Sequence, residues 1–343
     1  MESTPPVTYR RLGRSGLKIS VPIIGSLSFG SPQWIPWVLD KEKALPILKA
    51  AWDLGINTID TANTYSNGVS EQIIAEFIEK NKISRHEIVI MTKCYRLVPD
   101  DIQIRVKRHP ELKEMPKYQN QHGLSRASIF NAVEASLKRL NTSYIDLLQI
   151  HRYDPDVPPE EIMKALHDLI RAGKVRYIGA SSMRTWQFCH LNHVAEKNGW
   201  TKFVSMQNEY SLLYREEERE MNAYCNFEGI GIIPWGPVAG GSLTRPVNAQ
   251  TSTPRGEEKM RQAELSEADK EIINRVEEIA RKKGWTIAQV AIVWLASKVA
   301  SPVIGISSAG RLKEALVSDK LLTEEESKYL EEPYIPKPVR GHL

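Results

Sequence analysis

The sequence predicts an α/β protein whose single domain is a (β/α)8 barrel, and three observations lead to this prediction. Short runs rich in β-branched residues alternate with amphipathic stretches along almost the whole chain, as in repeated βα units around a parallel sheet. Eight such pairs fit into the 343 residues, which is long enough for one barrel. An open sheet with a dinucleotide site would need a turn of the G-x-G-x-x-G type, and the sequence contains none.

The predicted strands are short and mostly apolar, and each is followed by a predicted amphipathic helix. The strands are expected at 22–28, 58–62, 88–93, 145–151, 175–181, 203–209, 231–236 and 302–307. The helices are expected at 43–54, 70–80, 125–140, 159–172, 184–198, 216–228, 286–297 and 309–319.

Local signals agree with these boundaries. Ser125 provides a side-chain oxygen that caps the helix predicted at 125–140. Glycines that adopt a left-handed conformation without strain stand where four helices are expected to end, at Gly55, Gly173, Gly199 and Gly229.

Several segments lie outside the repeat. Residues 8–19, with glycines at 13 and 16, predict a β-hairpin that closes the N-terminal end of the barrel, with a frayed terminus as the alternative. Long loops are expected at 94–124 and 238–266, an extra helix at 267–283, and another near the C-terminus before a tail at 334–343. Barrels build their sites from loops at the carboxyl ends of their strands, so the two long loops are expected to border the active site.

Composition limits the class of partner. The net charge of +4 is too small and too dispersed to indicate a nucleic-acid partner. The basic run at 105–109 lacks interleaved aromatic residues and is expected to be a solvated loop.

The sequence also bears on location. Its three cysteines are isolated, which argues against a disulfide framework or a zinc site and favours a reducing compartment. The N-terminal residues lack the features of a signal peptide, and the longest apolar run, 290–296, is too short to span a bilayer. We therefore expect a cytoplasmic protein with no membrane partner and no bound metal.

Four chemically active residues lie at the ends of the second, third and fourth predicted strands or just beyond: Asp60, Tyr65, Lys93 and His151. Each residue alone has an ordinary structural explanation. Together, at one barrel mouth, a carboxylate, a phenol, an amine and an imidazole predict a proton-transfer site.

The roles of these groups follow from their acid–base properties. A phenol is a poor acid at neutral pH unless a nearby cation stabilises its anion, and Lys93 is that cation. Asp60 would keep the amine charged in a partly dry cavity, while His151 would donate a hydrogen bond to a carbonyl oxygen. Such a group moves a proton but supplies no electrons, so a reduction also requires a hydride donor.

These residues lie in segments that resemble the aldo-keto reductases. The resemblance begins in 54–71, which includes Asp60 and Tyr65, and continues through 90–93, 146–151, 179–182, 206–210 and 302–305. It covers nearly the whole chain in the expected order. Residues 213–220 and 243–246 are similar to the fungal aryl-alcohol dehydrogenase-like branch. The resemblance implies a TIM barrel, an NADP(H) coenzyme and a catalytic tetrad at Asp60, Tyr65, Lys93 and His151.

The resemblance also implies which residues bind the coenzyme, with Gln207 near the carboxamide and Trp235 stacked on the nicotinamide in place of the usual Tyr. Residues 236–245 would cover the pyrophosphate, and residues 305–314 the adenosine phosphate. Arg311 would clamp a 2′-phosphate, which favours NADP(H) over NAD(H). The full set is Gly25, Ser26, Leu27, Asp60, Ser181, Ser182, Gln207, Trp235, Gly236, Pro237, Val238, Gly240, Arg245, Gly305, Ser307, Arg311 and Glu314.

The sequence departs from the family pattern at a few positions. Ser182 stands where many relatives have Asn, Ala315 replaces a common adenine-contacting Asn, and Ser307 stands where some relatives have a basic residue. These departures bear on the strength of the NADP preference. Arg152 and Tyr153 follow His151 where some branches have an aromatic residue at once, which alters the pocket.

Four aromatic residues are candidates to line the substrate pocket: Trp34, Trp37, Tyr95 and Tyr153. We therefore expect NADPH-dependent reduction of an aromatic or otherwise hydrophobic aldehyde or ketone by a monomer or homodimer. Two alternatives are physiological oxidation of an alcohol and a role as a coenzyme-sensing regulatory subunit. The intact tetrad disfavours the regulatory role.

Overall fold

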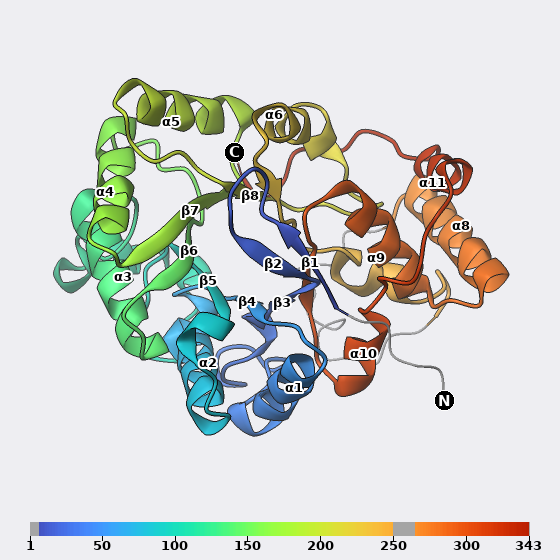
Figure 1. Cartoon of the computed structure of the whole chain (residues 1–343), viewed down its shortest axis with the longest axis horizontal. Helices are drawn as coiled ribbons and strands as arrows, with labels where there is room; N and C mark the ends of the chain where they lie inside the picture. The colour runs from blue at the N-terminus through green and yellow to red at the C-terminus, as the bar shows by residue number, and fades with distance from the viewer. Residues whose placement is uncertain (1–6, 250–264, 343) are drawn as a thin grey trace.

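The computed structural model describes residues 7–249 and 265–342, and it confirms the (β/α)8 barrel (Figure 1). The sheet has eight parallel strands in the order β10-β3-β4-β5-β6-β7-β8-β9. Their bounds are β3 (Ile23–Gly25), β4 (Thr58–Asp60), β5 (Val89–Cys94), β6 (Ile145–Ile150), β7 (Val175–Ser181), β8 (Ser205–Gln207), β9 (Gly231–Ile232) and β10 (Val303–Gly305). A parallel bridge between Trp235 and Val303 joins the two ends of the sheet, so the barrel closes.

Helices surround the sheet and bury their apolar faces on it. In α4 (Pro159–Arg171), for example, Ile162, Leu166 and Leu169 are fully buried at helical spacing, while acidic residues occupy the exposed first turn. The other helices are α1 (Lys41–Asp53), α2 (Val69–Lys80), α3 (Arg126–Leu140), α5 (Thr185–Lys197), α6 (Met221–Glu228), α8 (Glu267–Lys283), α9 (Ile287–Lys298), α10 (Ala309–Glu314) and α11 (Glu324–Glu331).

The predicted N-terminal hairpin is confirmed. Strands β1 (Thr8–Arg11) and β2 (Lys18–Val21) pair antiparallel, and they lie in front of the sheet in Figure 1. Leu12 and Ile19 are fully buried and pack with Met91, Leu147 and other side chains of the barrel strands. The hairpin therefore covers one end of the barrel, which leaves the opposite end for a site.

Several predicted elements are shorter than expected, and the strands predicted at 22–28, 58–62, 203–209 and 302–307 each keep only three residues in the sheet. The helix predicted at 216–228 begins only at Met221, after a 3-10 turn at Glu216–Glu218. The first predicted residues are not helical because tertiary contacts hold them: the carboxylate of Glu216 accepts hydrogen bonds from Tyr334 and from the backbone N–H of Lys337.

Two further differences have local causes. The helix predicted at 309–319 ends at Glu314, because the next three residues are all buried and successive helical positions cannot share one face. The strand predicted at 231–236 has a regular ladder only at Gly231–Ile232, since Pro234 has no N–H to donate.

Short 3-10 helices lie in both predicted long loops. Residues 94–124 contain three short 3-10 helices, Val106–Arg108, Pro110–Glu114 and Pro116–Tyr118. The second loop contains one such helix, Ala239–Thr244, and its residues 250–264 lie outside the described residues.

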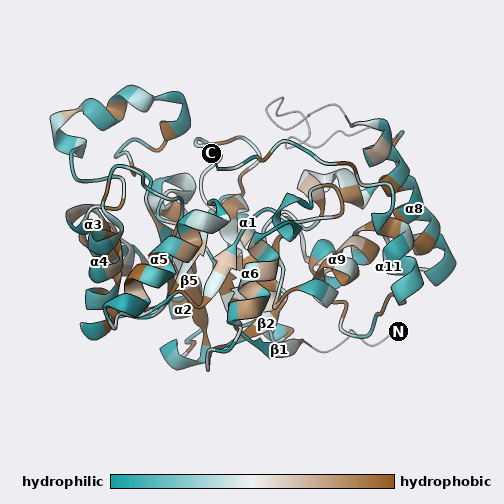
Figure 2. Ribbon diagram, turned by 90° about the horizontal axis from the view of Figure 1, so that it is seen from above, coloured by the Kyte–Doolittle hydropathy of each residue, from teal (hydrophilic) through white to brown (hydrophobic). Residues whose placement is uncertain are grey.

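The C-terminal tail crosses the end of the barrel opposite the hairpin, as the positions of β1, β2 and the C-terminus in Figure 2 show. Lys337 pairs with Asp269 of α8, and Arg340 pairs with Glu209 after β8 at 2.9 Å. The last described residue, His342, lies 3.8 Å from Glu217. Among all the described helices, none is both long and apolar enough to cross a membrane.

Candidate active site

A buried ion pair lies at the carboxyl ends of β4 and β5. The amine of Lys93 donates to Asp60 Oδ2 at 2.5 Å and to the carbonyl oxygen of Thr61 at 2.8 Å. Both charged side chains are almost fully inaccessible. Burial alone would lower the pKa of Lys93, but the charges of Asp60 and Tyr65 more than offset burial, so the pKa is raised. The amine is therefore a permanent cation at neutral pH.

The second oxygen of Asp60 is held by two side-chain amides. Gln149 and Gln207 each donate to Asp60 Oδ1 at 2.9 Å, and Gln207 also donates to Gln149 at 3.0 Å. Our sequence reasoning overlooked Gln149. Gln149 lies on β6 two residues before His151, so strand alternation places both side chains on the inner face. A single amide among apolar strand residues is the sequence signal that could have revealed Gln149.

Tyr65 begins a strained turn, η2 (Tyr65–Gly68), beside this ion pair. The ring is half-buried, and its centroid lies 5.2 Å from the amine of Lys93. The next three residues, Ser66, Asn67 and Gly68, all have positive φ angles, of 47°, 49° and 95°. Asn67 fixes the turn by donating to the carbonyl oxygen of Asp101 in the 94–124 loop at 2.8 Å. Strain of this kind persists where surrounding contacts hold a functional group in place.

His151 follows β6 and lies beside the phenol. The rings of His151 and Tyr65 meet edge to face, with centroids 6.2 Å apart. Burial, and next the charges of Arg152 and Lys93, lower the pKa of His151 well below its usual value, so the imidazole is neutral at pH 7. Its Nδ1 is buried and has no hydrogen-bond partner among the described residues. The structure thus brings the four predicted catalytic residues together at one end of the barrel.

The residues predicted to bind the coenzyme begin with the turn after β3. Gly25 packs so closely on Val303 that a Cβ there would lie 2.9 Å from its side chain. The hydroxyl of Ser26 is buried and accepts a hydrogen bond from Ser70 at 2.8 Å. Any contact from this turn would therefore come from its backbone or from the half-buried Leu27.

A second group of these residues lies after β7 and β8. Ser181 donates to the carbonyl oxygen of Gln207 at 2.7 Å, and the backbone N–H of Ser182 donates to Asn208 at 2.7 Å. Trp235 is half-buried, and its indole N–H points to the hydroxyl of Ser182 at 3.4 Å. Asn208, which the sequence reasoning did not single out, thus fixes the backbone beside Trp235.

The segment after Trp235 presents an open backbone. Gly236 and Gly240 have φ angles of 77° and 68°, and a Cβ on Gly240 would meet nothing within 4 Å. Between them Pro237 is buried and Val238 is half-buried, and Arg245 after them is also half-buried.

The third group lies after β10. Gly305, Ser307 and Arg311 are exposed, Glu314 is half-buried, and Arg311 donates to the hydroxyl of Ser307 at 3.1 Å. Arginine donors and open glycine backbone suit an anionic dinucleotide, so the residues present fit the coenzyme that the sequence predicts.

The four aromatic candidates for the substrate pocket are all half-buried. Tyr95 follows β5, next to Lys93 and Cys94. Tyr153 stacks edge to face on Trp186 of α5, with centroids 6.1 Å apart, and also packs on the core. Trp34 and Trp37 lie in the segment before α1.

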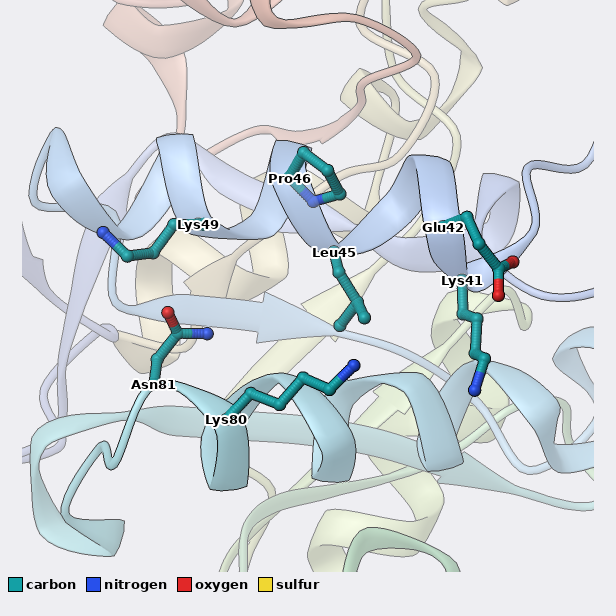
Figure 3. Close-up of a pocket in the computed structure, with 7 residues that line it drawn as sticks. All are labelled: Lys41, Glu42, Leu45, Pro46, Lys49, Lys80 and Asn81. Carbon is teal, nitrogen blue, oxygen red and sulfur yellow. The ribbon is translucent and has the colours of Figure 1, made fainter.

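Two surface grooves lie outside the barrel. One, of about 450 Å³, runs between α1 and the end of α2 and is lined by residues that include Lys41, Lys49 and Lys80 (Figure 3). All three lysines pair with carboxylates of the same two helices. The other, of about 730 Å³, lies between α5 and α6. Neither contains a residue of the predicted site, and the described part of the chain has no cluster of His, Cys, Asp or Glu suited to a metal ion.

Comparison with known families gives the class of protein. The model described as the aldo/keto reductase family matches residues 23–335. The chain therefore belongs to the aldo/keto reductases, which are oxidoreductases that typically use nicotinamide cofactors.

Individual relatives cover almost the whole chain. It is 56% identical to aldo-keto reductase dtxS3 of Metarhizium robertsii, over 99% of this chain and 94% of that protein. It is 50% identical to the putative aryl-alcohol dehydrogenase C977.14c of Schizosaccharomyces pombe, over the full length of both. It is 48% identical to versiconal hemiacetal acetate reductase of Aspergillus parasiticus, over 96% of this chain and 98% of that protein.

Proposed function

We propose that this protein reduces aldehydes or ketones to alcohols with NADPH. The observation that carries the proposal is the buried Asp60–Lys93 pair beneath a half-buried Tyr65, with a neutral His151 beside it. When bound, the coenzyme supplies a hydride, and the chain itself supplies the proton and the charge stabilisation.

The proton transfer assigned to this chain begins at Tyr65. As negative charge grows on the substrate oxygen, Tyr65 donates its phenolic proton to that oxygen, and the cation of Lys93 stabilises the phenolate that remains. Asp60 holds the amine charged, while the amides of Gln149 and Gln207 hold Asp60 in place.

His151 has a different role in this proposal. Because the imidazole is neutral, it donates a single N–H to the carbonyl oxygen and orients it without competing as an acid. The same site serves alcohol oxidation when the coenzyme is oxidised, so the direction in the cell follows the coenzyme ratio.

The test is to follow the loss of reduced-nicotinamide absorbance with a panel of aromatic aldehydes. Tyr65→Phe should lower kcat by at least about a hundredfold, because it removes the proton donor. Tyr177→Phe, the same chemical change on a ring that packs with the hairpin at the opposite end of the barrel, is the matched control and should retain most activity. Turnover that survives in Tyr65→Phe would contradict the proposed role.

Coenzyme choice is assigned to Arg311. We infer that its guanidinium, supported by Ser307, binds the 2′-phosphate of NADP(H). Arg311→Gln should therefore lower kcat/KM for NADPH about tenfold or more and leave kcat/KM for NADH unchanged. A wild-type preference for NADH would refute the assignment.

The substrate class and the cellular location are inferred from two further observations. Half-buried aromatic side chains at Trp34, Trp37, Tyr95 and Tyr153 favour an aromatic or hydrophobic carbonyl compound, in keeping with the relatives named as aryl-alcohol dehydrogenases. The three cysteines are free, which favours a cytoplasmic location. We keep a monomer or homodimer as the proposed state.

A further inference from the structure

Two arginines flank the site, and neither takes part in the chemistry described above. Arg96 lies three residues beyond Lys93, just after β5, and Arg152 follows His151 directly after β6. Arg152 donates to the carbonyl oxygen of His151. Within residues 7–249 and 265–342, no carboxylate forms an ion pair with either guanidinium.

Both guanidiniums are half-buried, and burying a charge without a counter-charge costs free energy. Burial, and next the positive charge of Arg96, lower the pKa of Arg152 to about 10. Burial also lowers the pKa of Arg96. The charges of Arg152 and Arg96 both lower the pKa of His151. Among the described residues, no carboxylate in direct contact neutralises these two guanidiniums.

The backbone that carries Arg96 is held in a defined shape. Tyr95 has a φ of 143°, a strained value for a non-glycine residue, and its carbonyl oxygen accepts a hydrogen bond from Gly123 at 2.7 Å. The carbonyl oxygen of Arg96 accepts from Asn63, which lies between Asp60 and Tyr65, at 3.1 Å. Strain that surrounding contacts maintain so close to the catalytic group indicates a positioned side chain rather than a loose surface arginine.

The coenzyme is not the expected partner of this charge. Its predicted contacts lie at or after the ends of β7, β8, β9, β10, β3 and β4, whereas the two arginines follow β5 and β6. In the observed strand order, β5 and β6 lie across the barrel from β9 and β10, whose following segments hold the arginines predicted to bind phosphate. The anion that Arg96 and Arg152 would neutralise must therefore enter with the substrate.

We propose that Arg96 and Arg152 bind a carboxylate on the substrate, so that this enzyme prefers carbonyl compounds that carry a carboxylate away from the reacting carbon. The proposal rests on the proposed carbonyl-reductase function and specifies its substrate class. Guanidinium groups suit a carboxylate because they offer paired N–H donors to its two oxygens. The surrounding aromatic side chains are compatible with an aromatic ring between the aldehyde and the acid.

The experiment compares 4-carboxybenzaldehyde with 4-carbamoylbenzaldehyde, which has nearly the same shape but no charge. At low ionic strength, we expect kcat/KM to be about tenfold or more higher for the carboxylate, mainly through KM, and the ratio to fall as salt is added. Arg96→Gln and Arg152→Gln should each reduce the ratio about tenfold while changing kcat/KM for the amide by less than about threefold.

Two further variants complete the design. Arg281→Gln removes an equal charge from an exposed position on α8 and should leave the ratio unchanged. Arg152→Lys keeps the charge and should keep part of the preference. If a glutamine variant does not fold, the salt dependence of the wild-type ratio still tests the proposal.

The outcomes separate this proposal from the one on which it rests. Equal kcat/KM for the two aldehydes, or an equal loss of both in the glutamine variants, refutes carboxylate recognition and leaves the reductase function intact. Failure to reduce either aldehyde, or any aldehyde of the panel, refutes both proposals.

Discussion

The substitution Asp60→Asn removes the counter-charge of Lys93 and should destabilise the folded protein. The Lys93 side chain is 1% exposed, and without Asp60 its remaining acceptors are the uncharged carbonyl oxygen of Thr61 and the phenol of Tyr65. Asparagine also places an NH2 group in a position that now receives donors from Gln149, Gln207 and Lys93. The variant therefore leaves the Lys93 cation buried without a counter-charge, and it brings at least two N–H donors face to face with no acceptor between them.

The magnitude follows from burial. Breaking a buried ion pair by removing one partner costs about 3–5 kcal/mol. The pair Lys49–Asp53 on α1 is the matched control, because its separation of 2.6 Å is nearly equal but its side chains are 49% and 54% exposed. Asp53→Asn should cost less than about 1 kcal/mol. The difference between the two substitutions isolates the effect of burial.

Urea unfolding monitored by tryptophan fluorescence at pH 7 measures both free energies. We also expect the double variant Asp60→Asn, Lys93→Met to be more stable than Asp60→Asn alone, since it removes the stranded cation. A free energy of unfolding for Asp60→Asn within 1 kcal/mol of wild type, or strict additivity in the double variant, would refute the reasoning.

Three other changes have defined outcomes. Burial raises the pKa of Glu217 from 4.5 to about 7, so the folded protein loses stability as pH rises from 4.5 to 7. Glu217→Gln should therefore have a free energy of unfolding up to about 3 kcal/mol above that of wild type in urea at pH 8, and nearly the same as wild type at pH 4.5. A thiol reagent at pH 8 should label only Cys189 in the native protein, because the other two cysteines are buried, and a second fast-reacting thiol would contradict this. Gly13→Ala should lower the free energy of unfolding by about 2–4 kcal/mol, because φ is 59° and a Cβ would lie 2.3 Å from a carbonyl oxygen. Gly16→Ala is the control, since a Cβ there would lie 3.8 Å from its nearest neighbour, and it should unfold at nearly the wild-type temperature.

The architecture and the position of the catalytic candidates were largely predictable. Strand period and the count of βα pairs determine a closed parallel barrel, and parallel strands bring their carboxyl ends to one rim. Residues at the ends of three successive strands, such as Asp60, Lys93 and His151, must therefore lie near one another. Tyr65 joins them because it follows β4 after only four residues.

Other features could not be predicted because they depend on contacts between distant segments. Glu216 looked like the start of a helix, but Tyr334 and Lys337 bind its carboxylate from more than a hundred residues away. The three successive left-handed residues after Tyr65 are equally nonlocal in origin, since Asn67 is fixed by a carbonyl group of the 94–124 loop. Sequence patterns do not encode such pairings.

The path of the C-terminal tail has a practical consequence for handling the protein. Gly341 lies against Trp235, close enough that a methyl group on it would be 3.9 Å from the indole. Any polypeptide continued beyond His342, such as an affinity handle or a fluorescent fusion, would start at the working rim of the barrel. A fusion joined ahead of β1 is the better choice for kinetic measurements, because β1 lies at the other end of the barrel in Figure 2.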